Sequence, residues 1–205
     1  MNGLDSDETS LLVCYVSNRR LGNGDSLIGY KRVCKMKPPM RQGAPDDFQT
    51  PPYALKPLLP YLDKDWVIWE PACGHGYLVD ELERLEFLVL ASDLHAEPSV
   101  DFLTRYVDYD CVITNPPYSL KQQFLERCYE NGRPFALLLP LTTFETGKRQ
   151  ALFREHGVEV IFFDKRINFE TPNKVEKSSA WFATAWFTWG LNIGQAMSFV
   201  ELERE

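Results

Sequence analysis

The sequence contains no cysteine pair with the spacing of a metal site or a disulfide framework. Its five cysteines, Cys14, Cys34, Cys73, Cys111 and Cys128, are scattered, and they form no Cys-x-x-Cys pair and no ligand spacing with a histidine. This distribution argues against a zinc site and against a disulfide-stapled secreted domain. We therefore expect reduced thiols and no bound metal.

Long apolar runs are also missing. No stretch approaches the roughly 18 apolar residues that a membrane span requires, and residues 1–5 lack the basic and apolar pattern of a signal peptide. We expect a soluble, cytoplasmic protein that does not contact a membrane.

Positive charge is scarce overall, because the formal net charge is −7. Residues 17–41 are the exception, with seven Lys and Arg against the single acid Asp25, which gives this segment a charge of +6. A basic segment on an acidic body can contact nucleic-acid phosphates. The alternative is a solvated arm without a partner.

The chain of 205 residues, 44% of them hydrophobic, has room for about one domain. Residues 1–45 mix glycines and prolines with charges and predict an irregular basic extension. We place the folded domain at 46–190 and a C-terminal tail at 191–205.

Within the domain, short apolar runs alternate with amphipathic segments, which predicts an α/β fold with a doubly wound, mostly parallel sheet. Thr50 stands where a cap of the first helix is expected, and Thr142 or Thr143 where a later cap is expected. Residues 94–108 contain only a weak strand candidate, so we expect the sheet to be reduced around its third strand. The expected strands are 66–69, 87–91, 110–114, 135–139, 158–163 and a long final strand at 179–189, and the expected helices begin near 51, 77, 120 and 143.

The tetrapeptide Asn115-Pro116-Pro117-Tyr118 follows one apolar run directly. Its prolines restrict the backbone and keep Asn115 extended at a strand end. An Asn oxygen and a neighbouring main-chain carbonyl accept hydrogen bonds, and Tyr118 offers a flat ring, so these parts suit a planar exocyclic amine. An ordinary Asn-Pro turn is the alternative.

The second candidate loop, residues 70–76, joins an apolar run to a helix. Gly74 and Gly76 let a backbone approach a ligand closely, and the carboxylate of Glu70 favours a cationic ligand group. No Lys-Ser or Lys-Thr pair follows, which argues against a P-loop nucleotide site.

Asp93 ends the next apolar run, 19 residues after Gly74, near the spacing of a ribose-binding acid. Its alternative role is a turn or helix cap. Asp101 and Phe102 can clasp an adenine through a carboxylate and a ring face, or be a loop acid and a core Phe.

Taken together, these residues resemble a class I S-adenosylmethionine-dependent methyltransferase of the adenine-N6 DNA type. The motifs follow the order of the gamma subgroup, as in short phage-encoded members, and cover about residues 46–190. They are Thr50-Pro51-Pro52, Glu70-Pro71-Ala72-Cys73-Gly74-His75-Gly76, Asp93, Asp101-Phe102 and Asn115-Pro116-Pro117-Tyr118.

The resemblance implies a Rossmann-like fold with an antiparallel last strand, S-adenosylmethionine as cofactor, and a bacterial or phage-infected host cytoplasm. It implies catalytic roles for Asn115, Pro116, Pro117 and Tyr118, with Asn115 and the Pro116 carbonyl accepting the target amine hydrogens and Tyr118 stacking on the flipped base. The implied cofactor-binding residues are Thr50, Pro51, Glu70, Pro71, Ala72, Cys73, Gly74, Gly76, Asp93, Asp101, Phe102 and Asn115.

Further substrate contacts are expected from Phe169, as a second aromatic clamp, and from Lys121 and Lys148 near phosphates. Each has an ordinary alternative, a core Phe or charged surface residues. The expected partner is DNA, with RNA adenine-N6 methylation, protein glutamine-N5 methylation and a non-catalytic binding module as alternatives. Residues 191–205 are too short for a target-recognition domain, so we expect the basic segment at 17–41 to substitute for one.

Overall fold

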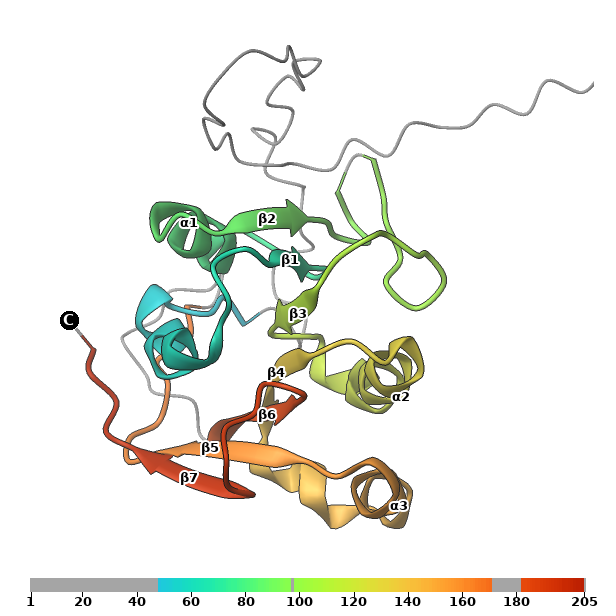
Figure 1. The fold of residues 1–205 in the computed structure, drawn as a ribbon, viewed down its shortest axis with the longest axis vertical. Helices are drawn as coiled ribbons and strands as arrows, with labels where there is room; N and C mark the ends of the chain where they lie inside the picture. The colour runs from blue at the N-terminus through green and yellow to red at the C-terminus, as the bar shows by residue number, and fades with distance from the viewer. Residues whose placement is uncertain (1–47, 97, 171–181, 205) are drawn as a thin grey trace, which may run out of the picture.

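The computed structural model describes residues 48–96, 98–170 and 182–204. The predicted extension at 1–45 and its basic segment lie outside these residues. Seven strands form one sheet in the order β2-β1-β3-β4-β6-β5-β7 (Figure 1). Among the described residues, no helix is long and apolar enough to cross a membrane.

The parallel half of the sheet comes first in the chain. β1 (Val67–Glu70) pairs in parallel with β2 (Leu88–Ala91) and with β3 (Cys111–Thr114), and β3 pairs in parallel with β4 (Phe135–Pro140). β6 (Thr184–Trp189) is antiparallel to β4 and to β5 (Glu159–Phe163). The predicted α/β fold with a mostly parallel sheet is confirmed.

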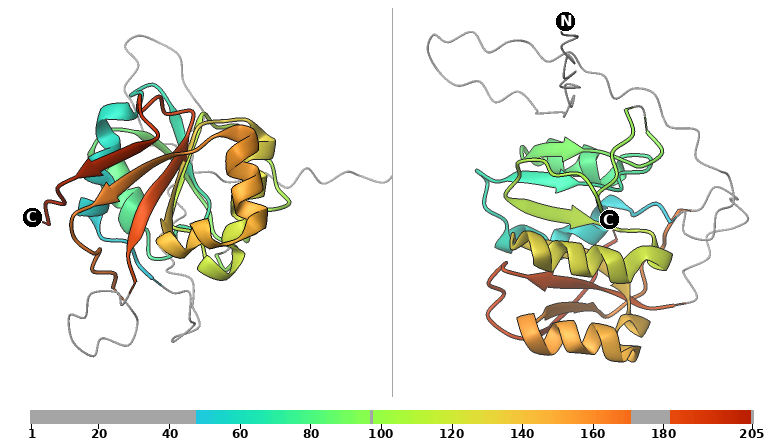
Figure 2. Two further views of the ribbon diagram at one scale, coloured as in Figure 1. Left: turned by 90° about the horizontal axis from the view of Figure 1, so that it is seen from below. Right: turned by 90° about the vertical axis from the view of Figure 1, so that its right-hand side faces the viewer.

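Helices cover both faces of the sheet and so create two hydrophobic cores (Figures 1 and 2). On one face lie η1 (Pro52–Tyr61) and α1 (Tyr77–Arg84), whose apolar residues pack with Ile68 and Trp186. On the other lie α2 (Lys121–Asn131) and α3 (Gly147–His156), which pack with Phe135 and Phe187. This three-layer arrangement buries both faces of the central strands.

The region between β2 and β3 is reduced, as predicted. Residues 92–96 and 98–110 form turns and loops without a strand. Val100, Phe102, Val107 and Tyr109 are nevertheless buried there. A packed loop therefore takes the place of a strand and helix.

The predicted long last strand needs correction. Within the described residues it begins at Thr184, and it is not last, because β7 (Met197–Val200) follows and pairs in parallel with β5. The antiparallel strand is thus β6, and the sheet continues past the predicted domain end at residue 190. Met197 and Phe199 lie on the exposed face of this strand, while Ser198 and the half-buried Val200 lie on the face toward the core.

Both predicted threonine caps are wrong. Thr50 makes no cap because the N-cap of η1 is Pro51, and this helix is of the 3-10 type with Pro57 and Pro60 inside it. Prolines lack the N–H that an α-helical bond needs. Two further 3-10 helices follow, η2 (Tyr118–Leu120) and η3 (Leu141–Glu145), and η3 contains Thr142 and Thr143. Instead, α3 is capped by Thr146, whose side chain accepts from the Arg149 amide at 3.5 Å.

Candidate active site

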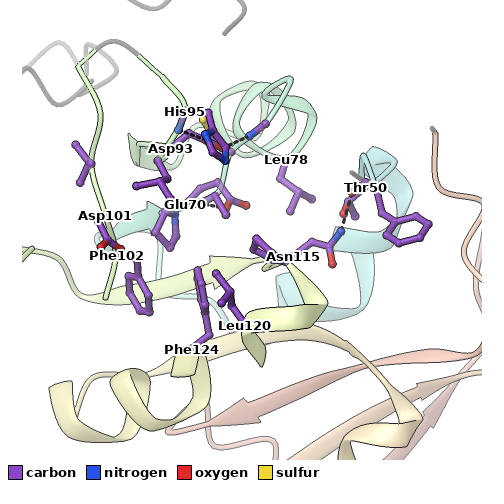
Figure 3. A pocket seen from close by; sticks show the side chains of 18 of the residues that line it. Thr50, Glu70, Leu78, Asp93, His95, Asp101, Phe102, Asn115, Leu120 and Phe124 are labelled. Atoms are coloured by element: carbon purple, nitrogen blue, oxygen red, sulfur yellow. Dashed lines mark hydrogen bonds between the residues drawn. The ribbon is translucent and has the colours of Figure 1, made fainter. Parts of the chain in front are cut away.

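A pocket of about 660 Å³ lies at the carboxyl ends of β1, β2 and β3. β1 lies between β2 and β3, so the chain order reverses beside it, which is where open α/β sheets bind ligands. Glu70 ends β1, Asp93 follows β2 and Asn115 follows β3. Figure 3 shows these three side chains around one space, with Leu120 and Phe124 on its opposite side.

The predicted site residues divide into two groups. The pocket lining contains Thr50, Glu70, Pro71, Ala72, Cys73, Gly74, Asp93, Asp101, Phe102, Asn115 and Pro117. Outside that lining are Pro51, Gly76, Pro116, Tyr118, Lys121, Lys148 and Phe169.

Main-chain amides of the glycine loop between β1 and α1 donate hydrogen bonds to the residues that follow β2. The Gly74 amide donates to Asp93 Oδ2 at 3.0 Å, and the Cys73 amide donates to the Ser92 oxygen at 3.1 Å. Gly74 has φ +50°, and a Cβ added there would lie 2.8 Å from Gln49 Oε1. The positive φ therefore favours glycine at position 74, and a Cβ there would also displace the end of the Gln49 side chain.

Glu70 is buried, with 1% of its surface exposed. Burial is the largest influence and raises the pKa of Glu70 to about 8, although contacts with the Thr114 hydroxyl and the Ala72 amide oppose the shift and nearby Asp93 adds to it. The Ala72 amide donates to Glu70 Oε1 at 3.1 Å. A buried carboxyl of this kind is prepared to receive a cation.

Asp93 is held at both oxygens by main-chain amides. Besides the bond from Gly74, Oδ1 accepts from the His95 amide at 2.8 Å, and the side chain is 9% exposed. Each carboxylate oxygen has two lone pairs, so acceptor capacity remains for ligand hydroxyls. Asp93 thus combines the predicted pocket position with the alternative turn-capping role.

Asp101 and Phe102 have the local roles of a loop acid and a core Phe, and both also line the pocket. Asp101 Oδ1 accepts from the Leu103 amide at 3.0 Å, as a turn acid does. Phe102 is 2% exposed and packs between Trp69 and Phe124, at centroid distances of 5.1 and 4.7 Å. Both line the pocket, so they form part of its wall as well as of the fold.

Asn115 lines the pocket, and its side-chain amide has one partnered atom and one atom without a partner among the described residues. Its Nδ2 donates to the Phe48 main-chain oxygen at 2.8 Å (Figure 3), while Oδ1 is buried and has no hydrogen-bond partner among the described residues. Buried polar atoms are rarely left unpaired, and such an atom needs an explanation. A ligand donor is the explanation that the pocket position favours.

Tyr118 and Phe169 lie in an aromatic cluster instead of in the pocket wall. Tyr118 is 9% and Phe169 8% exposed, and both contact Phe48 and Phe182. Lys121 Nζ donates to the Tyr118 main-chain oxygen at 2.8 Å and so closes the turn after the tetrapeptide. Lys148 is exposed in the first turn of α3.

Several lining residues were not predicted from the sequence. Leu120, the N-cap residue of α2, and Phe124 in the first turn of α2 stand four residues apart, a helical spacing that could have indicated a pocket face. Phe48 and Gln49 precede the first predicted motif and carried no signal. The remaining unpredicted residues are Tyr77, Leu78, Leu94, His95, Val100, Leu103 and Ser119.

No protein-family model matches the chain, and no curated protein matches it. Among solved structures, a candidate class I S-adenosylmethionine-dependent methyltransferase from Listeria monocytogenes matches with a TM-score of 0.53 and 14% identity over 79% of this chain and 68% of the other. The modification subunit of a candidate type I restriction enzyme from Vibrio vulnificus matches with a TM-score of 0.48 and 16% identity.

The Vibrio vulnificus match covers 71% of this chain but only 45% of that subunit. The similarity to the Listeria monocytogenes structure is one of fold, because the two sequences share few residues. The described residues therefore have the Rossmann-like fold of class I methyltransferases.

Proposed function

We propose that the protein transfers a methyl group from S-adenosylmethionine to the exocyclic N6 amine of adenine in DNA. The observation that carries this proposal is the buried, unpartnered Oδ1 of Asn115 at the edge of a pocket that also contains the glycine loop. A hydrogen-bond acceptor without a donor, placed beside a cofactor-sized cavity, suits an incoming amine.

The residues of the pocket fit S-adenosylmethionine. Glu70 is a buried carboxyl without a cation among the described residues, and a ligand ammonium would supply one. Asp93 keeps acceptor capacity for ribose hydroxyls. Asp101 and the apolar wall of Phe102 and Phe124 would receive an adenine.

The protein's part in the reaction would be to orient the amine that receives the methyl group. Asn115 Oδ1 and the Pro116 carbonyl would accept the two amine hydrogens and thereby aim the nitrogen lone pair. When bound, the cofactor would supply an electrophilic methyl group, which the amine nitrogen would take from the sulfonium sulfur before losing a proton to solvent. Positioning of this kind requires no covalent enzyme intermediate.

The choice of DNA as acceptor rests on the order of the motifs. RNA adenine and protein glutamine amides present similar planar amines, so the acceptor must be identified by experiment. Incubation with methyl-labelled cofactor and unmethylated DNA, RNA or peptide, followed by nuclease or protease digestion, separates the three. We expect N6-methyladenine in the DNA product, and its absence across varied DNA sequences would contradict the proposal.

The same assay separates an enzyme from a non-catalytic binding module. Asn115→Ala should abolish transfer, whereas Asn131→Ala, at the far end of α2, serves as a matched control with normal transfer. A wild-type protein that binds the cofactor by calorimetry and transfers no label to any of the three acceptors would identify a binding module.

A further inference from the structure

Phe48 lies at the centre of a cluster of four aromatic rings beside the pocket. Its ring centroid lies 5.4 Å from Phe182, 5.6 Å from Phe169 and 5.7 Å from Tyr118. We propose that the Phe48 ring fills the slot in which the acceptor base stacks on Tyr118, so that a base enters only when Phe48 swings out. This inference rests on the proposed function, because it concerns the acceptor side of the same site.

The rings of Phe48 and Tyr118 are stacked like a base on its platform. Their planes differ by 24°, whereas Phe182 meets Phe48 at 83° and Tyr118 at 82°. Tyr118 is only 9% exposed and lies outside the pocket lining, while Phe48 is half-buried and lines the pocket. The ring that faces the pocket is therefore Phe48, and it covers the face of Tyr118 on which a base would stack.

The cluster also supplies the other walls that a flat ring needs. Phe169, the predicted second clamp, faces Phe48 at an interplanar angle of 59° and lies 6.3 Å from Phe182. Phe48 thus contacts both residues expected to hold the base, Tyr118 and Phe169. In the proposed closed state, the Phe48 ring takes the place of the substrate base next to these two residues.

The main chain of Phe48 is anchored, while its half-buried side chain lines the pocket. The Phe48 oxygen accepts from Asn115 Nδ2, and the next residue, Gln49, exchanges two main-chain bonds with Glu170 at 2.9 and 3.0 Å. Gln49 Oε1 also accepts from the His75 amide at 2.9 Å. Rotation about the Cα–Cβ bond can therefore move the ring into the pocket opening while Asn115 keeps its orientation.

When the Phe48 ring occupies the slot, it lowers the apparent affinity of the protein for the substrate base. If the open state is populated at about one tenth, removal of the ring should tighten binding of an unstacked base by about tenfold. Because the residue 48 carbonyl is retained in any variant, the amine-orienting group stays in place. Phe48 is in this sense a gate for the acceptor.

The test measures binding without turnover. A single-stranded DNA oligonucleotide with one 2-aminopurine reports stacking by fluorescence quenching, and it is titrated into wild type, Phe48→Ala and the milder Phe48→Leu. We expect about tenfold tighter binding for Phe48→Ala and a smaller gain for Phe48→Leu. Phe162→Leu, a half-buried ring on β5, controls for general loss of packing. Thermal melts show that each variant is folded.

A second substitution identifies the platform. Addition of Tyr118→Ala to Phe48→Ala should abolish the gain in affinity if the base stacks on Tyr118. Equal or weaker binding by both folded Phe48 variants would overturn the gate and show that Phe48 is itself a wall of the site. Tighter binding without methylation of any acceptor would support the gate and contradict the proposed function, so the two failures are distinguishable.

Discussion

The side-chain amide of Asn115 donates from Nδ2 to the main-chain oxygen of Phe48 over 2.8 Å. The residues are 67 positions apart, so the bond ties the segment before η1 to the loop after β3. It also fixes the orientation of the amide, since only Oδ1 is then left to accept a hydrogen bond. The group that we propose to accept the target amine is thus oriented by a contact outside the tetrapeptide.

Asn115→Asp tests this relationship. The substitution places a second oxygen against the Phe48 carbonyl, and two acceptors repel where a donor and acceptor had paired. We expect a loss of roughly 1–3 kcal/mol in the free energy of unfolding, measured by chemical denaturation. Transfer should be slower than in wild type but faster than in Asn115→Ala, which retains no side-chain acceptor. If the free energy of unfolding of Asn115→Asp equals that of wild type, the hydrogen bond to Phe48 contributes little to stability.

The buried carboxyl of Glu70 predicts a pH-dependent stability of the free protein. Its pKa is raised from 4.5 to about 8, so the folded state binds the proton more tightly than the unfolded state. The contribution of Glu70 to stability is therefore greatest below about pH 4.5 and declines as the pH rises towards 8, by roughly 4–5 kcal/mol at most. Glu70→Gln keeps an acceptor for Ala72 but cannot ionise. Its stability relative to wild type should rise between pH 5 and pH 8, and a constant difference would contradict the shift.

The same carboxyl predicts proton release on cofactor binding. A bound ammonium favours the carboxylate, so Glu70 must lose its proton when the ligand enters. Affinity for S-adenosylhomocysteine should rise by roughly tenfold between pH 6 and 7.5 in calorimetric titrations. Methylthioadenosine lacks the amino-acid group and should show no such dependence, and Glu70→Gln should remove it. A pH-independent affinity in wild type would place the ammonium elsewhere.

The strand-end residues of the pocket could be predicted because their signal is local. Glu70, Asp93 and Asn115 each follow an apolar run, and parallel pairing brings the ends of such runs to one edge of the sheet. The reduced third strand was equally visible, since residues 94–108 contain no continuous apolar run of strand length.

Features that depend on tertiary contacts could not be predicted in this way. β7 carries two of its apolar residues, Met197 and Phe199, on the exposed face and places Ser198 beside Val200 on the face toward the core, which departs from the usual pattern. Phe48 contacts the site across 67 residues of sequence. Tyr118 was expected in the pocket wall, yet the ring of Phe48 covers it, and nothing within the tetrapeptide indicates this.

A comparison of Gly74 with Gly132 distinguishes the effect of backbone strain from the effect of crowding beside the pocket. Both have positive φ, +50° and +62°, so alanine is strained at either position. Only at Gly74 does an added Cβ meet a neighbour, Gln49 Oε1 at 2.8 Å, and Gly132 has open space around it at the end of α2.

Gly74→Ala should therefore impair ligand binding as well as stability. The new methyl group pushes against the Gln49 side chain, which accepts from the His75 amide, and it disturbs the amide that Gly74 donates to Asp93. We expect cofactor affinity to fall by at least about tenfold with a stability loss of about 1–2 kcal/mol. Gly132→Ala should lose similar stability and bind the cofactor normally in the same titrations. Equal affinities for the two variants would show that the glycine loop does not contact the cofactor.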